Sequence, residues 1–127
     1  MSYTAPVKDI AFALNHIVGL ADIAKLEGFE DASPDLIEAV LEESAKFTGD
    51  VLAPLNWIGD QQGCQCDDGV VTTPDGWKEA YSQFIENGWG SLSFSTEFGG
   101  QGMPLIVAAA VQEMWHSANM SLSLIHI

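Results

Sequence analysis

Apolar residues near the start of the chain recur at the spacing of one helical face. Between residues 7 and 26 they stand three or four positions apart: Ile10, Leu14, Ile17, Ala21 and Ala24. This spacing is typical of an amphipathic α-helix, because it brings the apolar side chains to one side. The pattern predicts a first helix over residues 7–26 that ends at Gly28.

A second helix is predicted directly afterwards. Ser33 is suited to cap the free backbone N–H groups, Pro34 to occupy the first helical position, and Asp35 to face the positive end of the helix dipole. Pro54 removes one backbone hydrogen bond further along, so we expect a kink or an end of the helix at residues 48–52. The apolar positions of this helix are Ile37, Val40, Leu41, Ala45, Val51, Leu52 and Leu55.

Residues 60–76 interrupt the helical pattern. They are rich in Gly, Asp, Gln, Cys, Thr and Pro and finish in the turn-forming sequence Pro74-Asp75-Gly76, so they predict one long loop. A third helix then follows and is expected to stop at Asn87-Gly88. Four residues mark its apolar face: Trp77, Tyr81, Phe84 and Ile85.

The last part of the chain is the most apolar. Residues 89–94 predict a short extended piece, and residues 97–102 a glycine-rich loop. Pro104 suits the first position of a fourth helix. The run 105–124 is apolar on nearly every side, so this helix is expected in the centre of a bundle.

The length and the composition fit one folded domain. The chain has 127 residues, of which 47% are hydrophobic and 17% charged, which is a globular rather than a disordered composition. The predicted elements make the fold class all-α: a bundle of about four helices with one long loop. We expect residues 1–32 to be a leading extension and residues 33–127 to be the main helical domain.

The charge excludes two classes of partner. The chain has 18 Asp and Glu against 4 Lys and Arg, a net charge of -14. Nucleic acids and anionic membrane surfaces bind through Lys and Arg, so neither is expected as a partner. No run approaches the ~20 apolar residues of a membrane span, and the N-terminus does not resemble a signal peptide. Because the two cysteines are also too close for a relaxed disulfide, we expect a cytoplasmic protein.

Two groups of residues invite a chemical interpretation. Gly99-Gly100-Gln101-Gly102 lies ahead of a helix, where backbone N–H groups bind phosphate in some proteins, but it lacks the spacing of phosphate loops and is better explained as a tight turn. Cys64 and Cys66 stand beside Asp67 and Asp68. Because zinc requires four ligands and no second Cys or His pair is suitably spaced, no metal site is expected.

Three ionisable side chains in the helices have both a structural and a catalytic interpretation. His16 and His116 are far apart in sequence and have no partner motif, so a structural role is favoured for each. Glu113 is the only charge after Glu97; if buried, it requires a partner, and a structural hydrogen bond is favoured over acid–base catalysis. The aromatic residues favour a core over a ligand cage: Trp77, Tyr81, Phe84, Trp89 and Trp115.

Residues 84–104 resemble a hallmark of the N-terminal domain of acyl-CoA dehydrogenases. In that family a Gly-Trp pair, here Gly88-Trp89, precedes a glycine-rich turn of the kind at residues 97–102. Gln112-Glu113 resembles the Glu-Glu pair of the family. The resemblance covers about residues 32–124.

Further residues indicate which part of the family the chain resembles and where it departs from the family pattern. Residues 47–63 resemble the second helix of the family, including its internal proline at Pro54. Ser95-Thr96 departs from the usual Pro-Glu. The additional helix before Ser33, together with residues 71–77, resembles the bacterial subgroup that includes 3-methylmercaptopropionyl-CoA dehydrogenases.

The resemblance implies an FAD-dependent oxidoreductase that desaturates an acyl-CoA between its α and β carbons. In the family a glutamate takes the α proton, the β hydrogen leaves as hydride to the flavin, and electron-transfer flavoprotein accepts the electrons. A homo-oligomeric complete enzyme is also implied. The base, the flavin-binding β-domain and the C-terminal bundle follow residue 127 in the family order, so no catalytic or cofactor-binding residue and no activity are expected here.

The expected contribution of this chain is one wall of the acyl pocket, formed by Met120, Leu122 and Ser123, with ordinary interhelical packing as the alternative. Residues 122–127 also equal the translation of a transposase end sequence used in sequencing libraries. We therefore hypothesise that the native sequence stops near Ser121, which the uninterrupted genomic sequence tests.

Two other classes of protein share the small size and the acidity. A stand-alone acidic helical module that binds a protein partner is the alternative function, and it predicts a natural stop codon. An acyl carrier protein is excluded, because Asp31-Ala32-Ser33 is not the Asp-Ser-Leu attachment site.

Overall fold

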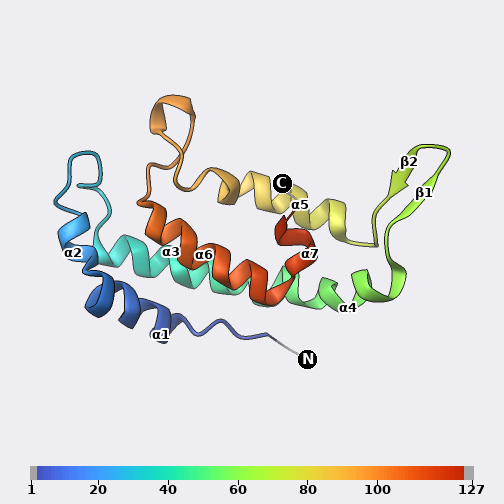
Figure 1. The fold of residues 1–127 in the computed structure, drawn as a ribbon, viewed down its shortest axis with the longest axis horizontal. Helices are drawn as coiled ribbons and strands as arrows, with labels where there is room; N and C mark the ends of the chain where they lie inside the picture. The colour runs from blue at the N-terminus through green and yellow to red at the C-terminus, as the bar shows by residue number, and fades with distance from the viewer. Residues whose placement is uncertain (1–2, 125–127) are drawn as a thin grey trace.

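The structure, a computed structural model, describes residues 3–124. It has 66% helix and 5% strand, which confirms the all-α class. Within the described residues no helix has the length and the apolar content needed to cross a membrane. The elements (Figure 1) are α1 (Val7–Phe12), the π-helical turn η1 (Ala13–Val18), α2 (Leu20–Ile23), α3 (Pro34–Phe47), the π-helical segment η2 (Thr48–Leu52), α4 (Ala53–Gln62), β1 (Gln65–Asp67), β2 (Val70–Thr72), α5 (Trp77–Glu86), the 3-10 turns η3 (Trp89–Ser91) and η4 (Thr96–Phe98), α6 (Leu105–Ala118) and α7 (Met120–Ser123).

The packed part of the molecule is built around α3 and η2. α1 contacts α3, and α6 contacts both α3 and η2 (Figure 1). α4 leads away from this part to the hairpin of β1 and β2, and α5 returns from the hairpin over the bundle. One hydrophobic core joins these elements, and its most buried residues include Leu20, Leu41, Leu52, Val107, Val111 and Met114.

The start of α3 is confirmed. The Ser33 Oγ accepts a hydrogen bond from the backbone N–H of Leu36 at 3.3 Å, and Pro34 is the first helical residue. The distortion expected at residues 48–52 is also present, as the π-helical segment η2. Because Pro54 has no N–H to donate, the chain takes wider turns ahead of it and then continues as α4.

The first helix is interrupted, so the prediction of one helix over residues 7–26 is wrong. α1 passes into η1, which ends at Gly19 in the left-handed conformation with φ 77°. Glycine adopts this φ without the steric cost that a Cβ would bring, so the break occurs here and not at Gly28. The wider π-helical turn also leaves Ile17 75% exposed, while Leu20 beyond the break is buried.

The long loop contains a β-hairpin that the sequence analysis did not predict. β1 and β2 pair antiparallel, with Asp67 opposite Val70. The two residues between them, Asp68 and Gly69, have φ values of 47° and 79°. Positive φ at both central residues is the requirement of a tight hairpin turn, and Asp-Gly is one of its preferred sequences.

The third helix, α5, has the predicted position, and Gly88 follows it in the left-handed conformation with φ 72°. The extended piece expected at residues 89–94 is wrong, because local hydrogen bonds fold it into turns. The N–H of Ser91 donates to the carbonyl of Gly88 at 3.1 Å, and the N–H of Phe94 donates to the carbonyl of Ser91 at 3.1 Å.

The last helix is shorter and less enclosed than expected. α6 begins directly after Pro104 but stops at Ala118, and Asn119 is extended, with φ -156° and ψ 90°. α6 packs on α3, η2 and α7 and, through Trp115, on α5 and η3, yet Leu105 and Glu113 are exposed. Half of the residues of α6 are buried, which agrees with the predicted central position, but the premise of a buried Glu113 is wrong.

An aromatic cluster joins α3, α5, η3 and α6. Trp115 meets Phe84 edge to face, with 4.9 Å between ring centroids, and meets Trp89 in the same way at 6.1 Å. Trp89 and Trp115 are buried, whereas Tyr81 is at the surface. The core interpretation is thus confirmed for Trp89 and Trp115 and for Trp77 and Phe84, which are partly buried and pack against the core, but not for Tyr81.

Candidate functional site

The residues expected at an acyl pocket lie on α7, a short helix that Asn119 sets apart from α6. The Asn119 Oδ1 accepts a hydrogen bond from the backbone N–H of Leu122 at 3.0 Å. This is the N-cap arrangement, for which asparagine is one of the preferred residues. A single capping residue therefore ends the apolar run and starts α7.

Asn119 also joins two distant parts of the chain. Its Nδ2 donates to the carbonyl of Leu52 at 3.2 Å, and both residues are buried. An amide side chain has both donors and an acceptor, so the same residue caps α7 and fastens it to η2. The position of α7 is thus set by a contact with the π-helical segment beside Pro54.

The three expected pocket residues point in different directions. Met120 is 52% exposed, whereas Leu122 is 1% exposed and belongs to the hydrophobic core. Ser123 is buried, and its hydroxyl donates to the carbonyl of Met120 at 2.9 Å. Of the three, only Ser123 lines one of the cavities described here.

The Ser123 cavity has a volume of about 240 Å³ and lies where α5, η3, α6 and α7 meet. Four of its ten lining residues are aromatic, and Ser93, Gln112 and Ser123 are the polar side chains among them. Among the described residues that line it, none is an acid, a base or a thiol. The cavity is therefore suited to hold an apolar group, not to transfer protons. Its aromatic lining residues are Phe84, Trp89, Phe94 and Trp115.

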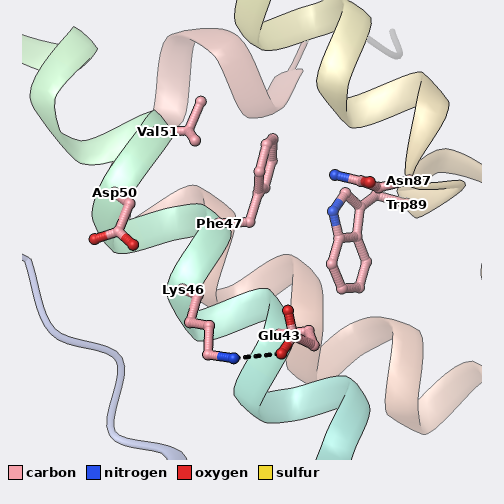
Figure 2. Close-up of a pocket in the computed structure, with 7 residues that line it drawn as sticks. All are labelled: Glu43, Lys46, Phe47, Asp50, Val51, Asn87 and Trp89. Carbon is pink, nitrogen blue, oxygen red and sulfur yellow. Dashed lines mark hydrogen bonds and ion pairs between the residues drawn. The ribbon is translucent and has the colours of Figure 1, made fainter.

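Trp89 also lines a second hollow of about 440 Å³, between α3, η2 and the end of α5 (Figure 2). Its apolar floor includes Phe47 and Trp89, whose rings stack at 6.2 Å between centroids. Lys46 and Glu43 form an ion pair at the rim. The hydrogen bond that Lys46 donates to Glu43, together with the negative charge of Glu43, raises the pKa of Lys46, but both side chains are exposed and the pair adds little stability.

The histidines and cysteines that the sequence offers as candidates lie outside the Ser123 cavity. His16 is exposed beside the ring of Phe12, at 4.8 Å between centroids, and the Nδ1 of His116 lies 2.6 Å from the carbonyl oxygen of Gln112. The contact of His116 with its own helix supports the structural interpretation. Cys64 and Cys66 are free and exposed. In the part of the chain that the structure describes, no three His, Cys, Asp or Glu side chains are placed to hold a metal ion.

Comparison with known proteins identifies the family. The chain is 43% identical over 124 residues to the 3-methylmercaptopropionyl-CoA dehydrogenase of Ruegeria pomeroyi, a match that covers 98% of this chain and 21% of that enzyme. It is 31% identical over 125 residues to the butyryl-CoA dehydrogenase of Syntrophomonas wolfei, which covers 95% of this chain and 20% of that enzyme. The chain belongs to the acyl-CoA dehydrogenase family. It spans about a fifth of the length of these curated relatives. No protein-family model matches the sequence.

An acyl-CoA dehydrogenase implies FAD, and the glycine-rich loop tests whether these residues fit that group. The N–H of Gly100 donates to the carbonyl of Ser95 at 3.0 Å, and the N–H of Gly102 donates to that of Phe94 at 2.9 Å. A Cβ on Gly100 would lie 2.1 Å from the carbonyl oxygen of Phe94, so glycine is required by the backbone of the loop itself. The donors are used within the loop, which confirms the tight turn. The glycine-rich loop therefore does not fit the pyrophosphate of FAD.

Asn119 is the structurally important residue that the sequence did not predict. An asparagine followed by a short polar and apolar stretch is an N-cap signal. It was outweighed by the apolar run on either side, which by itself predicts a continuous helix. The N-cap signal was present in the sequence. The second hydrogen-bond partner of Asn119, Leu52, lies 67 positions away, and nothing in the local sequence indicates that contact.

Proposed function

We propose that this chain forms the N-terminal helical domain of an FAD-dependent acyl-CoA dehydrogenase that desaturates an acyl-CoA thioester between its α and β carbons. The main support is 43% identity to a dehydrogenase of an acyl-CoA over nearly the whole chain. In this proposal the catalytic base and the flavin site belong to the remainder of the enzyme. The chain alone is inactive.

The part we assign to this chain is one wall of the acyl pocket. Ser123 contributes through the aromatic cavity, where its neighbours are suited to an apolar acyl group. Leu122 fixes α7 in the core, and Met120 offers a flexible, polarizable side chain at the surface of α7. The three residues therefore serve the wall in different ways: one borders the cavity, one anchors the helix and one faces outward.

The complete enzyme in this proposal has further properties taken from the family. It binds FAD outside residues 3–124, passes electrons to electron-transfer flavoprotein, forms a homo-oligomer and is cytoplasmic. The division into a leading extension, residues 1–32, and a helical domain, residues 33–127, is part of the same proposal.

The test is to read the gene beyond codon 121 from an intact genome and to purify the complete product. We expect a yellow protein whose flavin absorbance bleaches with an acyl-CoA; 3-methylmercaptopropionyl-CoA and butyryl-CoA are the two substrates to compare. A stop codon at this point, with no cofactor region downstream, would refute the proposal. That result favours the stand-alone acidic interaction module instead.

The pocket wall is tested separately in the complete enzyme. Once the genomic codons are known, Met120→Ala and Ser123→Ala are compared with Ser121→Ala, an exposed position on the same helix. We expect the first two to change KM for the acyl-CoA and the third to leave it unchanged. Equal KM values in all three variants would exclude α7 from the pocket wall.

A further inference from the structure

An apolar groove of about 330 Å³ lies between the N-terminal helical segment and α6. α1 and α6 both pack on α3 (Figure 1), and the groove is the space that their side chains leave between them. Ile10, Leu14 and Ala110 are buried residues that line it. The groove shares no lining residue with the Ser123 cavity, so it is a separate site from the proposed pocket wall.

Small side chains on both walls explain why the groove is open. Ala13 belongs to η1, and Ala109 and Ala110 belong to α6. Protein interiors are normally packed to high density, so alanines at facing positions leave room for side chains that another element supplies. Ile17 and Leu105, at 75% and 73% exposure, add large apolar surface on the same two segments.

The rim of the groove is acidic. Asp9 and Glu113, one from each wall, are its two charged lining residues, and no lysine lines it. Within residues 3–124 the ion pairs join Lys25 to Asp22 and Lys46 to Glu43, so neither rim acid is paired with a cation. An occupant with apolar side chains in the middle and positive charges on its flanks would complement this surface.

We infer that the groove binds an amphipathic helix of another polypeptide, with Lys or Arg on either side of its apolar stripe. A helix that presents apolar residues at i, i+3 or i+4 and i+7 matches a groove between two helices. Its cations pair with Asp9 and Glu113. A second copy of this chain is a poor occupant, because each copy has a net charge of -14 and only 4 basic residues.

The probe is a synthetic helix of roughly 18 residues, about five turns, with a leucine stripe flanked by lysines and a fluorescent label. Its anisotropy is followed while the chain is titrated in. Ala109→Lys fills the groove and repels the peptide, and we expect it to weaken binding roughly tenfold or more. Ala39→Lys is the matched control, since Ala39 is exposed on α3 and does not line the groove; binding stays within about twofold of the parent.

A second pair of variants tests the charges. Asp9→Asn with Glu113→Gln should weaken binding roughly fivefold at low salt and less at high salt, because salt screens exposed charges. Glu79→Gln with Glu86→Gln removes the same charge from α5, and we expect little change. Circular dichroism confirms that each variant retains its helix content.

Three results would overturn the inference. The first is that Ala109→Lys weakens peptide binding no more than Ala39→Lys, or that the two double variants weaken it equally. Either result would mean that the basic peptide is attracted to the acidic protein in general and not to the groove. Another is undiminished binding of a peptide whose leucines are replaced by serine. The third is binding by the 127-residue chain but not by the complete gene product, since the groove would then be covered by its own polypeptide.

Discussion

Replacing Asn119 by alanine removes two interactions from the buried junction of α6, α7 and η2. The side chain caps α7 through the N–H of Leu122 and donates to the carbonyl of Leu52. Serine at the same position separates the two effects. It ranks with asparagine as an N-cap, but its short hydroxyl cannot replace the amide that donates to Leu52.

The magnitude follows from the two lost contacts. Loss of a cap costs about 1 kcal/mol. Loss of the amide removes a donor from the Leu52 carbonyl in a site where neither residue is exposed, at a cost of about 1–3 kcal/mol. We therefore expect the free energy of unfolding to fall by roughly 2–4 kcal/mol in Asn119→Ala and by about 1–3 kcal/mol in Asn119→Ser. The alanine variant should melt about 10 °C lower than the parent.

The assay is urea unfolding followed by tryptophan fluorescence, since Trp89 and Trp115 are buried beside this junction and report on the core. Each curve is repeated at several protein concentrations, because a midpoint that does not depend on concentration shows that a monomer unfolds. Asn15→Ala is the control; Asn15 is exposed, so we expect its free energy of unfolding to stay within about 0.5 kcal/mol of the parent.

Two outcomes would refute the reasoning. If the alanine and serine variants lose the same free energy, the cap on α7 contributes nothing. If Asn119→Ala is no less stable than Asn15→Ala, the Leu52 contact does not stabilise the chain. An unchanged slope against urea is required for either comparison, because a changed slope would mean that the surface exposed on unfolding had changed.

Three further predictions concern other parts of the chain. Ser33→Ala removes the cap of α3 and should lower the free energy of unfolding by about 1 kcal/mol in the same assay, and Ser33→Asp should restore it. Gly100→Ala places a Cβ 2.1 Å from the carbonyl oxygen of Phe94, so we expect a loss of more than about 2 kcal/mol and faster amide exchange in the loop; unchanged exchange would contradict the tight turn. Burial raises the pKa of Tyr3 above its ordinary value of 10.0. A hydrogen bond with Ser117 lowers it by a smaller amount, and the negative charge of Glu113 raises it slightly. The folded chain therefore favours the protonated phenol of Tyr3. The contribution of this phenol to the free energy of unfolding is complete below pH 10 and is lost as the pH rises through the raised pKa. Tyr3→Phe should abolish this loss, and absorbance titration of tyrosinate measures the pKa directly.

Residues that act on their immediate neighbours allowed much of the fold to be predicted. Ser33 and Pro34 located the start of α3, Gly88 the end of α5, and Pro54 the distortion at η2. Each of these effects depends on backbone hydrogen bonds within one or two helical turns. Apolar spacing was less reliable, because it cannot detect a π-helical turn, and it therefore carried the first predicted helix past Gly19.

The candidate site was harder to predict, because it depends on contacts between distant residues. Met120 and Ser123 are three positions apart, which in a long helix would place them on one face. In the structure α7 has four residues, Met120 is exposed and Ser123 borders the aromatic cavity. Which of them meets a cavity is decided by the packing of Trp89 and Trp115, and nothing near residue 120 in the sequence indicates it.

The cap on α7 restricts which residue can follow at position 122 in the native gene. Asn119 accepts its hydrogen bond from the backbone N–H of residue 122, so proline is excluded there. Leu122 is 1% exposed in the core, so a polar side chain at this position would be buried without a hydrogen-bond partner. If residues 122–127 derive from adapter sequence, the intact genome should therefore still encode an apolar residue other than proline at codon 122. Proline or a charged residue at that codon would mean that α7 does not pack on η2 in the native chain, and Asn119 would then lose its role as the link between them.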